Sequence, residues 1–144
     1  MNRVFPTGDE PPRRAPETAP TPPSRDPSTI DTLLREARRL LASRSYADVI
    51  RKLEVHRPAE WAAIDGSGVR LVRLLGQAHL GLGDLRAAID CLEHVRSAER
   101  ERPQLTRDEL ASALSDLYKC YSGLELRELA ADCLAEARRL QRGG

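Results

Sequence analysis

The residues best able to bind a metal ion are three cysteines and three histidines. Cys91 and His94 are three positions apart, so they would share one face of a helix. A structural zinc site needs four ligands with suitable spacing. The remaining donors are scattered: His56, His79, Cys120 and Cys133. The cysteine count is odd and no CxxC pair occurs, which argues against a zinc ribbon or a disulfide framework. We predict no metal site and no cofactor.

The acids and hydroxyls show no catalytic pattern. No Ser/His/Asp or Cys/His spacing typical of a triad can be read from the chain, although triads can assemble from distant positions. Asp90 and Asp132 fall on mid-helix faces, where ion pairs are the simpler role. Gly66, Ser67 and Gly68 predict a loop, but without the preceding strand or the GKS/T ending of a phosphate-binding loop. We therefore predict that the protein is not an enzyme.

Charge and hydropathy exclude two classes of partner. The 144 residues include 23 Lys or Arg and 22 Asp or Glu, a net charge of +1. This balance gives no global attraction to nucleic acid or to an anionic membrane. No stretch reaches the ~18 apolar residues of a membrane helix, and Pro6 comes too early for a signal peptide. We expect no nucleic-acid partner, no membrane association and a cytoplasmic location.

Proline divides the chain into two regions. Eight of the ten prolines lie in residues 1–27. Proline fixes φ and removes a backbone donor, so helix and sheet are both disfavoured there. The large apolar side chains of this segment are only Met1, Val4 and Phe5, too few to offset the entropy of ordering. We predict a disordered, proline-rich tail at 1–27, either a linker or a docking segment, and one folded domain at 28–144.

The folded region shows helical periodicity throughout. Apolar residues recur at i, i+3, i+4 and i+7, and no segment alternates with period two. Ser28 or Thr29 is expected to cap the first helix and Asp84 the fourth. Thr106 and Glu109 have the spacing of a capping box for the fifth. Six helices are predicted, and the class is all-α. The breaks between them are expected at 43–45, Pro58, 66–68, 81–83, Pro103 and Gly123.

The helices repeat as pairs. A shift of 42 residues aligns 88–92 (Ala-Ile-Asp-Cys-Leu) with 130–134 (Ala-Ala-Asp-Cys-Leu) and brings Arg96 onto Arg138. A shift of 39 in the other direction brings Arg57 onto Arg96 in a weaker match. Self-similarity of this kind indicates a repeated helix–turn–helix unit. It also explains the cysteine in each aligned segment as a small residue facing the core.

Residues 69–102 resemble a tetratricopeptide repeat. The family pattern of spaced apolar residues, Leu-Gly, a turn glycine and a later alanine is carried by Val72, Leu75, Gly76, His79, Gly83, Leu85, Ala88 and Leu92. Residues 111–142 and, in degenerate form, 30–58 are similar. The spacing of 39 and 42 exceeds the family length of about 34, and Tyr118 occupies a position where the family has a small residue. The resemblance implies a right-handed α-solenoid of three antiparallel helix pairs.

The resemblance also implies that the first helix of each pair lines a concave groove. The candidate partner-binding residues there are Arg38, Arg70, Arg73, Gln77 and Lys119. Arginine binds carboxylate through two parallel hydrogen bonds, so an acidic peptide or a terminal carboxylate would suit these positions. Asp116 lies near where family members that bind chaperone tails need a second basic group, so that ligand is not predicted. An ordinary solvated face and a sensor of small anions are the alternatives to this adaptor or chaperone-like function.

The last helix and the single tryptophan provide a second candidate surface. Leu126 and Leu129, with Cys133 and Leu140, lie partly outside the core stripe, and exposed apolar patches mark interaction sites. Trp61 is expected to fill the core between two repeats, or to anchor a partner if it is exposed. The alternative function is therefore a self-assembling subunit or a scaffold within a larger complex, with the chain as a homo-oligomer.

Overall fold

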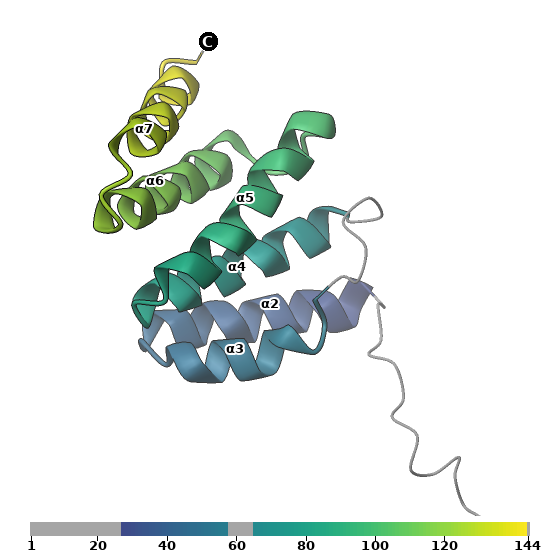
Figure 1. Ribbon diagram of the computed structural model, residues 1–144. Helices are drawn as coiled ribbons and strands as arrows, with labels where there is room; N and C mark the ends of the chain where they lie inside the picture. The colour runs from purple at the N-terminus through teal and green to yellow at the C-terminus, as the bar shows by residue number, and fades with distance from the viewer. Residues whose placement is uncertain (1–26, 58–64, 144) are drawn as a thin grey trace, which may run out of the picture.

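The computed structural model describes residues 27–57 and 65–143. Within these ranges every regular element is an α-helix (Figure 1), so the predicted all-α class is confirmed. The helices are α2 (Pro27–Ala42), α3 (Tyr46–Glu54), α4 (Gly66–Gly81), α5 (Leu85–Glu101), α6 (Arg107–Gly123) and α7 (Arg127–Gln141). The predicted tail, apart from Pro27, and the tryptophan at position 61 lie outside the described residues.

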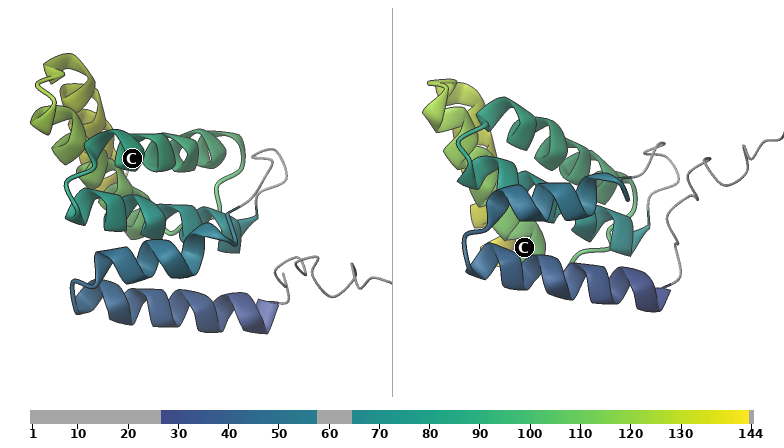
Figure 2. Two further views of the ribbon diagram at one scale, coloured as in Figure 1. Left: turned by 60° about the horizontal axis from the view of Figure 1, so that its bottom comes forward. Right: turned by 90° about the horizontal axis from the view of Figure 1, so that it is seen from below.

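Short and long connections alternate along the chain. Three residues join α2 to α3, α4 to α5 and α6 to α7, whereas residues 55–65 and 102–106 form the other two connections. Each helix packs against the next one. In addition, α2 contacts α4, and α4 contacts α6. Figure 2 shows α2 and α3 at one end of the array and α6 and α7 at the other. The helices α2, α4 and α6 therefore form one continuous row.

The three short turns share one backbone feature. Arg44, Gly83 and Glu125 each adopt a positive φ, of 61°, 83° and 61°. Glycine adopts this left-handed conformation freely, whereas other residues do so at a steric cost. The three positions are 39 and 42 residues apart, the same offsets that the sequence repeat gives. The sequence repeat is thus matched by a repeat in backbone conformation, with one left-handed residue at the equivalent position of each turn.

Capping side chains define three of the helix starts, those of α4, α5 and α6. Asp84 accepts a hydrogen bond from the Ala87 amide at 3.3 Å, as predicted. At the start of α6, the Thr106 hydroxyl accepts from the Glu109 amide at 3.1 Å, and the Glu109 carboxylate accepts from the Thr106 amide at 2.9 Å. This reciprocal pair is the predicted capping box. It satisfies two backbone donors that the first turn of a helix would otherwise leave free.

Two sequence-based boundaries are wrong. Ser28 and Thr29 do not cap the first helix but lie inside α2, which begins at Pro27. Proline suits the first helical position because its φ is already helical and its missing donor has no partner to lose. The predicted loop at 66–68 is instead the first turn of α4. Asp65 caps this turn by accepting from the Gly68 amide at 2.8 Å, which offsets the low helix propensity of glycine.

The core follows the facing sides of the helices. The fully buried leucines on α3 to α6 are Leu53, Leu71, Leu74, Leu75, Leu92, Leu114 and Leu117. Gly76 allows α4 and α5 to approach closely, because a Cβ there would lie 2.7 Å from Leu92 Cγ. Cys91 and Cys133 are both buried, as the repeat predicts. Burial raises the pKa of the Cys91 thiol to about 11, so this side chain stays protonated and serves packing.

Candidate functional site

Residues from three contacting helices form a charged face. Arg38 comes from α2, Arg73 and Gln77 from α4, and Lys119 from α6. Burial is the main reason that the pKa of Arg73 is lowered, and the nearby charges of Arg38 and Arg70 lower it further. The structure therefore brings the predicted groove residues together. We call this surface, formed by Arg38, Arg70, Arg73, Gln77, Glu109, Asp116 and Lys119, the α2–α4–α6 face.

Arg70 connects two helices of this face. Its Nε lies 2.8 Å from Glu109 Oε2 and its Nη2 lies 2.9 Å from Glu109 Oε1. The Nη2 group also donates to the Gln104 carbonyl at 3.3 Å. The Arg70 hydrogen bonds are the main reason that the pKa of Glu109 falls to about 2. Because this bidentate pair uses both carboxylate oxygens, Arg70 mainly joins α4 to α6.

Arg73 lies one turn further along α4 and is much less well paired. Its Nη1 is 3.5 Å from the Ser112 hydroxyl, at the limit of a hydrogen bond. Its Nε is buried and has no hydrogen-bond partner among the described residues. A buried N–H without an acceptor costs roughly 1–3 kcal/mol. Arg73 therefore carries a positive charge and a donor that has no acceptor among the described residues.

Asp116 is the corresponding acceptor on α6. The residue is only 7% exposed, and its Oδ1 lies 3.9 Å from Lys119 Nζ. Its Oδ2 is buried and has no hydrogen-bond partner in the described part of the chain. Burial raises the pKa of Asp116, although Lys119, Arg73 and the Gln77 amide act to lower it. The face thus carries a buried carboxylate with one oxygen that lacks a hydrogen-bond partner. The groove residues predicted from the sequence included no acid, so the sequence did not reveal this group as part of the face.

A cavity of about 250 Å³ lies beside Asp116. Its lining residues are Leu41, Tyr46, Gln77, Leu80, Gly81 and Asp116. The Tyr46 ring packs directly over Gly81, since a Cβ at that glycine would be 2.5 Å from two ring atoms. The glycine therefore gives the aromatic wall its position. The cavity combines an apolar wall with a carboxylate and an amide.

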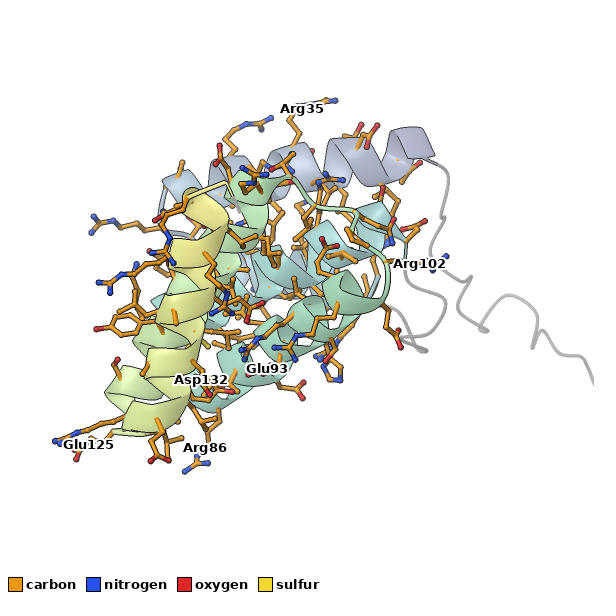
Figure 3. All side chains as sticks on the ribbon, turned by 90° about the horizontal axis from the view of Figure 1, so that it is seen from above. Arg35, Arg86, Glu93, Arg102, Glu125 and Asp132 are labelled. Atoms are coloured by element: carbon orange, nitrogen blue, oxygen red, sulfur yellow. The ribbon has the colours of Figure 1, made fainter. Side chains whose placement is uncertain are left out.

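An arginine joins each of the first two units to the next one. Arg57 donates to Asp90 of α5 at 2.8 Å. Arg96 donates to Glu136 of α7 at 3.1 and 2.9 Å and to Glu93 at 3.2 Å. Glu93, labelled in Figure 3, also accepts from the Tyr121 hydroxyl. The sequence repeat aligns Arg57 with Arg96 but predicts no role for either residue. In the structure both have the same role, which is to pair with an acid of the next unit.

The second candidate surface begins at α7. Leu126 and Leu129 are 43% and 44% exposed, so the apolar side chains expected at this end of the chain do reach the surface. Cys133 does not share this position, because it is fully buried. Leu140 is partly buried against the core. The large exposed apolar side chains at this end of the chain therefore lie in the first turn of α7 and at the residue before it.

The described residues 27–57 and 65–143 contain no group of three or more His, Cys, Asp or Glu side chains placed to hold a metal ion. In the same ranges, no helix combines the length and apolar character needed to cross a membrane. The chain matches no protein-family model, no curated protein and no solved structure. Function is therefore inferred from the geometry of the α2–α4–α6 face.

Proposed function

We propose that the chain is a non-catalytic adaptor or chaperone-like protein that binds a peptide or protein partner on the α2–α4–α6 face. The alternating connections, the equivalent left-handed turn residues and the row of α2, α4 and α6 support a three-unit helical solenoid. In such an array, antiparallel helix pairs of the tetratricopeptide type would stack with their first helices along a concave surface. Extended concave surfaces of this kind are what repeat proteins use for binding.

The observation that carries the proposal is the pair of unpartnered atoms on this face. Arg73 Nε and Asp116 Oδ2 are both buried and lack hydrogen-bond partners among the described residues, and the two charges act on each other. A donor and an acceptor left free in this way lower stability. An extended segment offers backbone carbonyls that could accept from Arg73 and donor groups, on its backbone or its side chains, that could reach Asp116, so it would satisfy both.

Charge on the same face supports a partner with acidic groups. Four cations face two carboxylates, which leaves a local excess of two positive charges. The cations are Arg38, Arg70, Arg73 and Lys119, and the carboxylates are Glu109 and Asp116. Complementary charge raises the rate of encounter and selects among partners. The near-neutral total charge of the chain conceals this local excess.

We expect Arg38→Gln/Arg73→Gln to weaken binding of the partner by about tenfold or more, because it removes both arginines of the face that lack a bidentate carboxylate partner among the described residues. The measurement is affinity capture with the wild-type chain, followed by titration of each captured protein against both forms. Arg70 is left unchanged because it joins α4 to α6. The matched control is Arg86→Gln/Arg127→Gln, at exposed positions of α5 and α7. Equal affinity of all three forms for every captured protein would contradict the proposal.

A self-assembling or scaffolding subunit is the second candidate function. The observation that favours it is the exposure of Leu126 and Leu129, since the last unit of a repeat array normally has a polar outer face. For a self-assembling chain, we expect light scattering after size exclusion to give a dimer for the wild type and a monomer for Leu126→Glu/Leu129→Glu. Leu82→Glu, at another exposed leucine, should leave the dimer intact. A wild type that stays monomeric at high concentration rejects self-assembly.

A further inference from the structure

We propose that the cavity beside Asp116 binds a lysine or arginine side chain of the segment that lies on the α2–α4–α6 face. The inference deepens the proposed function and rests on it for the source of that side chain. The face as a whole has an excess of positive charge, but the lining of this cavity includes a carboxylate, that of Asp116. Other described cavities are lined by different residues of α2 and α3.

The first argument is the state of the Asp116 carboxylate compared with the other buried acid. Glu99 is 5% exposed, and both its oxygens accept backbone N–H groups, from Gln104 and Leu105 at 2.9 to 3.1 Å. Asp116 is buried to a similar degree, yet its Oδ2 has no partner among the described residues, and the carboxylate has only the Gln77 amide and a distant ammonium beside it. Buried acids that serve folding are paired. Asp116 has the capacity to accept a charged donor from outside.

The distant ammonium does not satisfy this capacity. Lys119 Nζ lies 3.9 Å from Oδ1, beyond hydrogen-bond distance. Its side chain is 65% exposed, so its head group is largely hydrated and is held only weakly. Lys119 can move aside at little cost. A guanidinium or ammonium group in the cavity would then form the charge-assisted hydrogen bonds that the buried carboxylate lacks.

The second argument is the apolar wall. Leu41, Leu80 and the Tyr46 ring line the cavity together with the carboxylate. Lysine and arginine bury their methylene stems against apolar surface while the charged head reaches a polar partner. An aromatic ring adds an attraction for the cation. Gly81 keeps this wall in place, because any larger residue would push the Tyr46 ring away.

Other ligand classes fit less well. An anion in the cavity would be repelled by the Asp116 carboxylate, and it would bind more favourably to Arg73 nearby. A purely apolar side chain would leave Asp116 Oδ2 without a donor. A divalent cation prefers about six or more oxygen ligands, whereas the cavity lining supplies one carboxylate, one amide and one phenol oxygen. A long side chain with a cationic head is the class that satisfies both the wall and the acid.

The test uses small probes that need no knowledge of the partner. N-acetyl-arginine amide and N-acetyl-lysine amide are titrated into the full, ¹⁵N-labelled chain, and N-acetyl-citrulline amide serves as the uncharged control. We expect saturable shifts of the amide signals of Leu80, Gly81 and Asp116 with at least one charged probe and much smaller shifts with citrulline. Asp116→Asn should weaken that binding by about tenfold or more. Asp132→Asn, at an exposed position of α7 (Figure 3), should not.

The outcomes separate this inference from the proposed function. Absence of shifts at the cavity, equal shifts with citrulline, or unchanged binding by Asp116→Asn would each overturn the cavity as a basic-side-chain site. Such a result leaves the capture experiment with Arg38→Gln/Arg73→Gln unaffected. Conversely, probe binding that Asp116→Asn abolishes, beside captured proteins that ignore Arg38→Gln/Arg73→Gln, supports the cavity and overturns the proposed binding face.

A second variant guards against misfolding as an explanation. Asp116→Asn removes a buried charge whose ionised form lowers stability, so the variant is expected to fold. Gly81→Ala keeps the carboxylate and displaces the Tyr46 ring, so it should also weaken the charged probes. If Gly81→Ala binds them as tightly as the wild type while its spectrum shows that Tyr46 has moved, the apolar wall has no part in the site and the proposal fails.

Discussion

Replacing Glu109 by glutamine is expected to lower the free energy of unfolding by about 3 kcal/mol at neutral pH. Hydrogen bonds from Arg70 are the largest cause of the fall in the pKa of Glu109 from its ordinary value of 4.5 to about 2. Each pKa unit corresponds to about 1.4 kcal/mol. Both partners are less than a third exposed, so solvent screens the pair only partly. Glutamine still fits a capping box, so the variant isolates the charge.

The pH dependence of this loss has a definite sign. The pKa of Glu109 is lower in the folded chain than in the unfolded chain, so its contribution to stability is present above about pH 4.5 and disappears as the pH falls towards about 2. Asp116, whose pKa is raised, has the opposite sign. We therefore expect the difference between wild type and Glu109→Gln, rather than the wild-type curve alone, to vanish at low pH. Urea unfolding followed by circular dichroism measures this difference.

Asp108→Asn is the matched control for this experiment. Asp108 is the neighbouring acid in the first turn of α6 and is exposed, so its removal alters the interaction with the helix dipole but leaves the Arg70 pair intact. A loss below about 1 kcal/mol is expected for it. A double-mutant cycle with Arg70→Gln should recover most of the Glu109 effect as coupling energy. Equal losses for Glu109→Gln and Asp108→Asn would show that the bidentate pair contributes nothing to stability.

Local chemistry explains why much of the fold could be predicted. The apolar spacing of 3.6 residues identifies all six described helices. The cap at Asp84 and the box of Thr106 and Glu109 depend on residues at most three positions apart, so the sequence carries the whole signal. The failures at Ser28 and at 66–68 were also local. There the position of proline and the cap at Asp65 outweighed the usual preferences of serine and glycine.

Long-range geometry explains what the sequence did not reveal. Arg70 and Glu109 are 39 residues apart, and their contact depends on how α4 is offset along α6. The same offset brings Arg73 to Ser112. The sequence identified Arg70 and Arg73 as groove residues with similar roles, but the structure pairs Arg70 and leaves Arg73 with a donor that has no acceptor among the described residues. Only packing decides which of the two identical side chains forms an ion pair.

The burial of Asp116 could have been suspected from its position. It falls on α6 one residue before Leu117, inside a helix whose apolar positions 113, 114 and 117 are buried. An acid beside a core stripe is exposed or must find a partner. From the sequence alone, Asp116 indicates only that an acid lies near the position where family members that bind chaperone tails need a second basic group. That the carboxylate lines a cavity follows from Tyr46 and Leu41, which come from α3 and α2 and depend on the stacking of three units.

The other large effect is expected for Glu99, the acid that holds the connection between α5 and α6. Its carboxylate accepts the Gln104 amide at 2.9 and 3.1 Å and the Leu105 amide at 3.0 Å. Glu99→Ala leaves these two backbone donors without their charged acceptor. Because a hydrogen bond to a charged group is worth about 1.5–3 kcal/mol, we expect a loss of about 3 kcal/mol in the free energy of unfolding.

Glu99→Gln should give an intermediate loss, because the amide keeps one acceptor oxygen but turns an NH₂ group towards a backbone N–H. Hydrogen exchange separates this local effect from general destabilisation. The amides of Gln104 and Leu105 should lose protection in Glu99→Ala more than the core of α4 does. Glu101→Ala, at an exposed position in the same last turn, should change neither quantity by more than a small amount. If Glu101→Ala causes the same loss of stability and protection as Glu99→Ala, the Glu99 hydrogen bonds do not stabilise the connection. Helix packing alone would then hold it, with water replacing the carboxylate at the two backbone N–H groups.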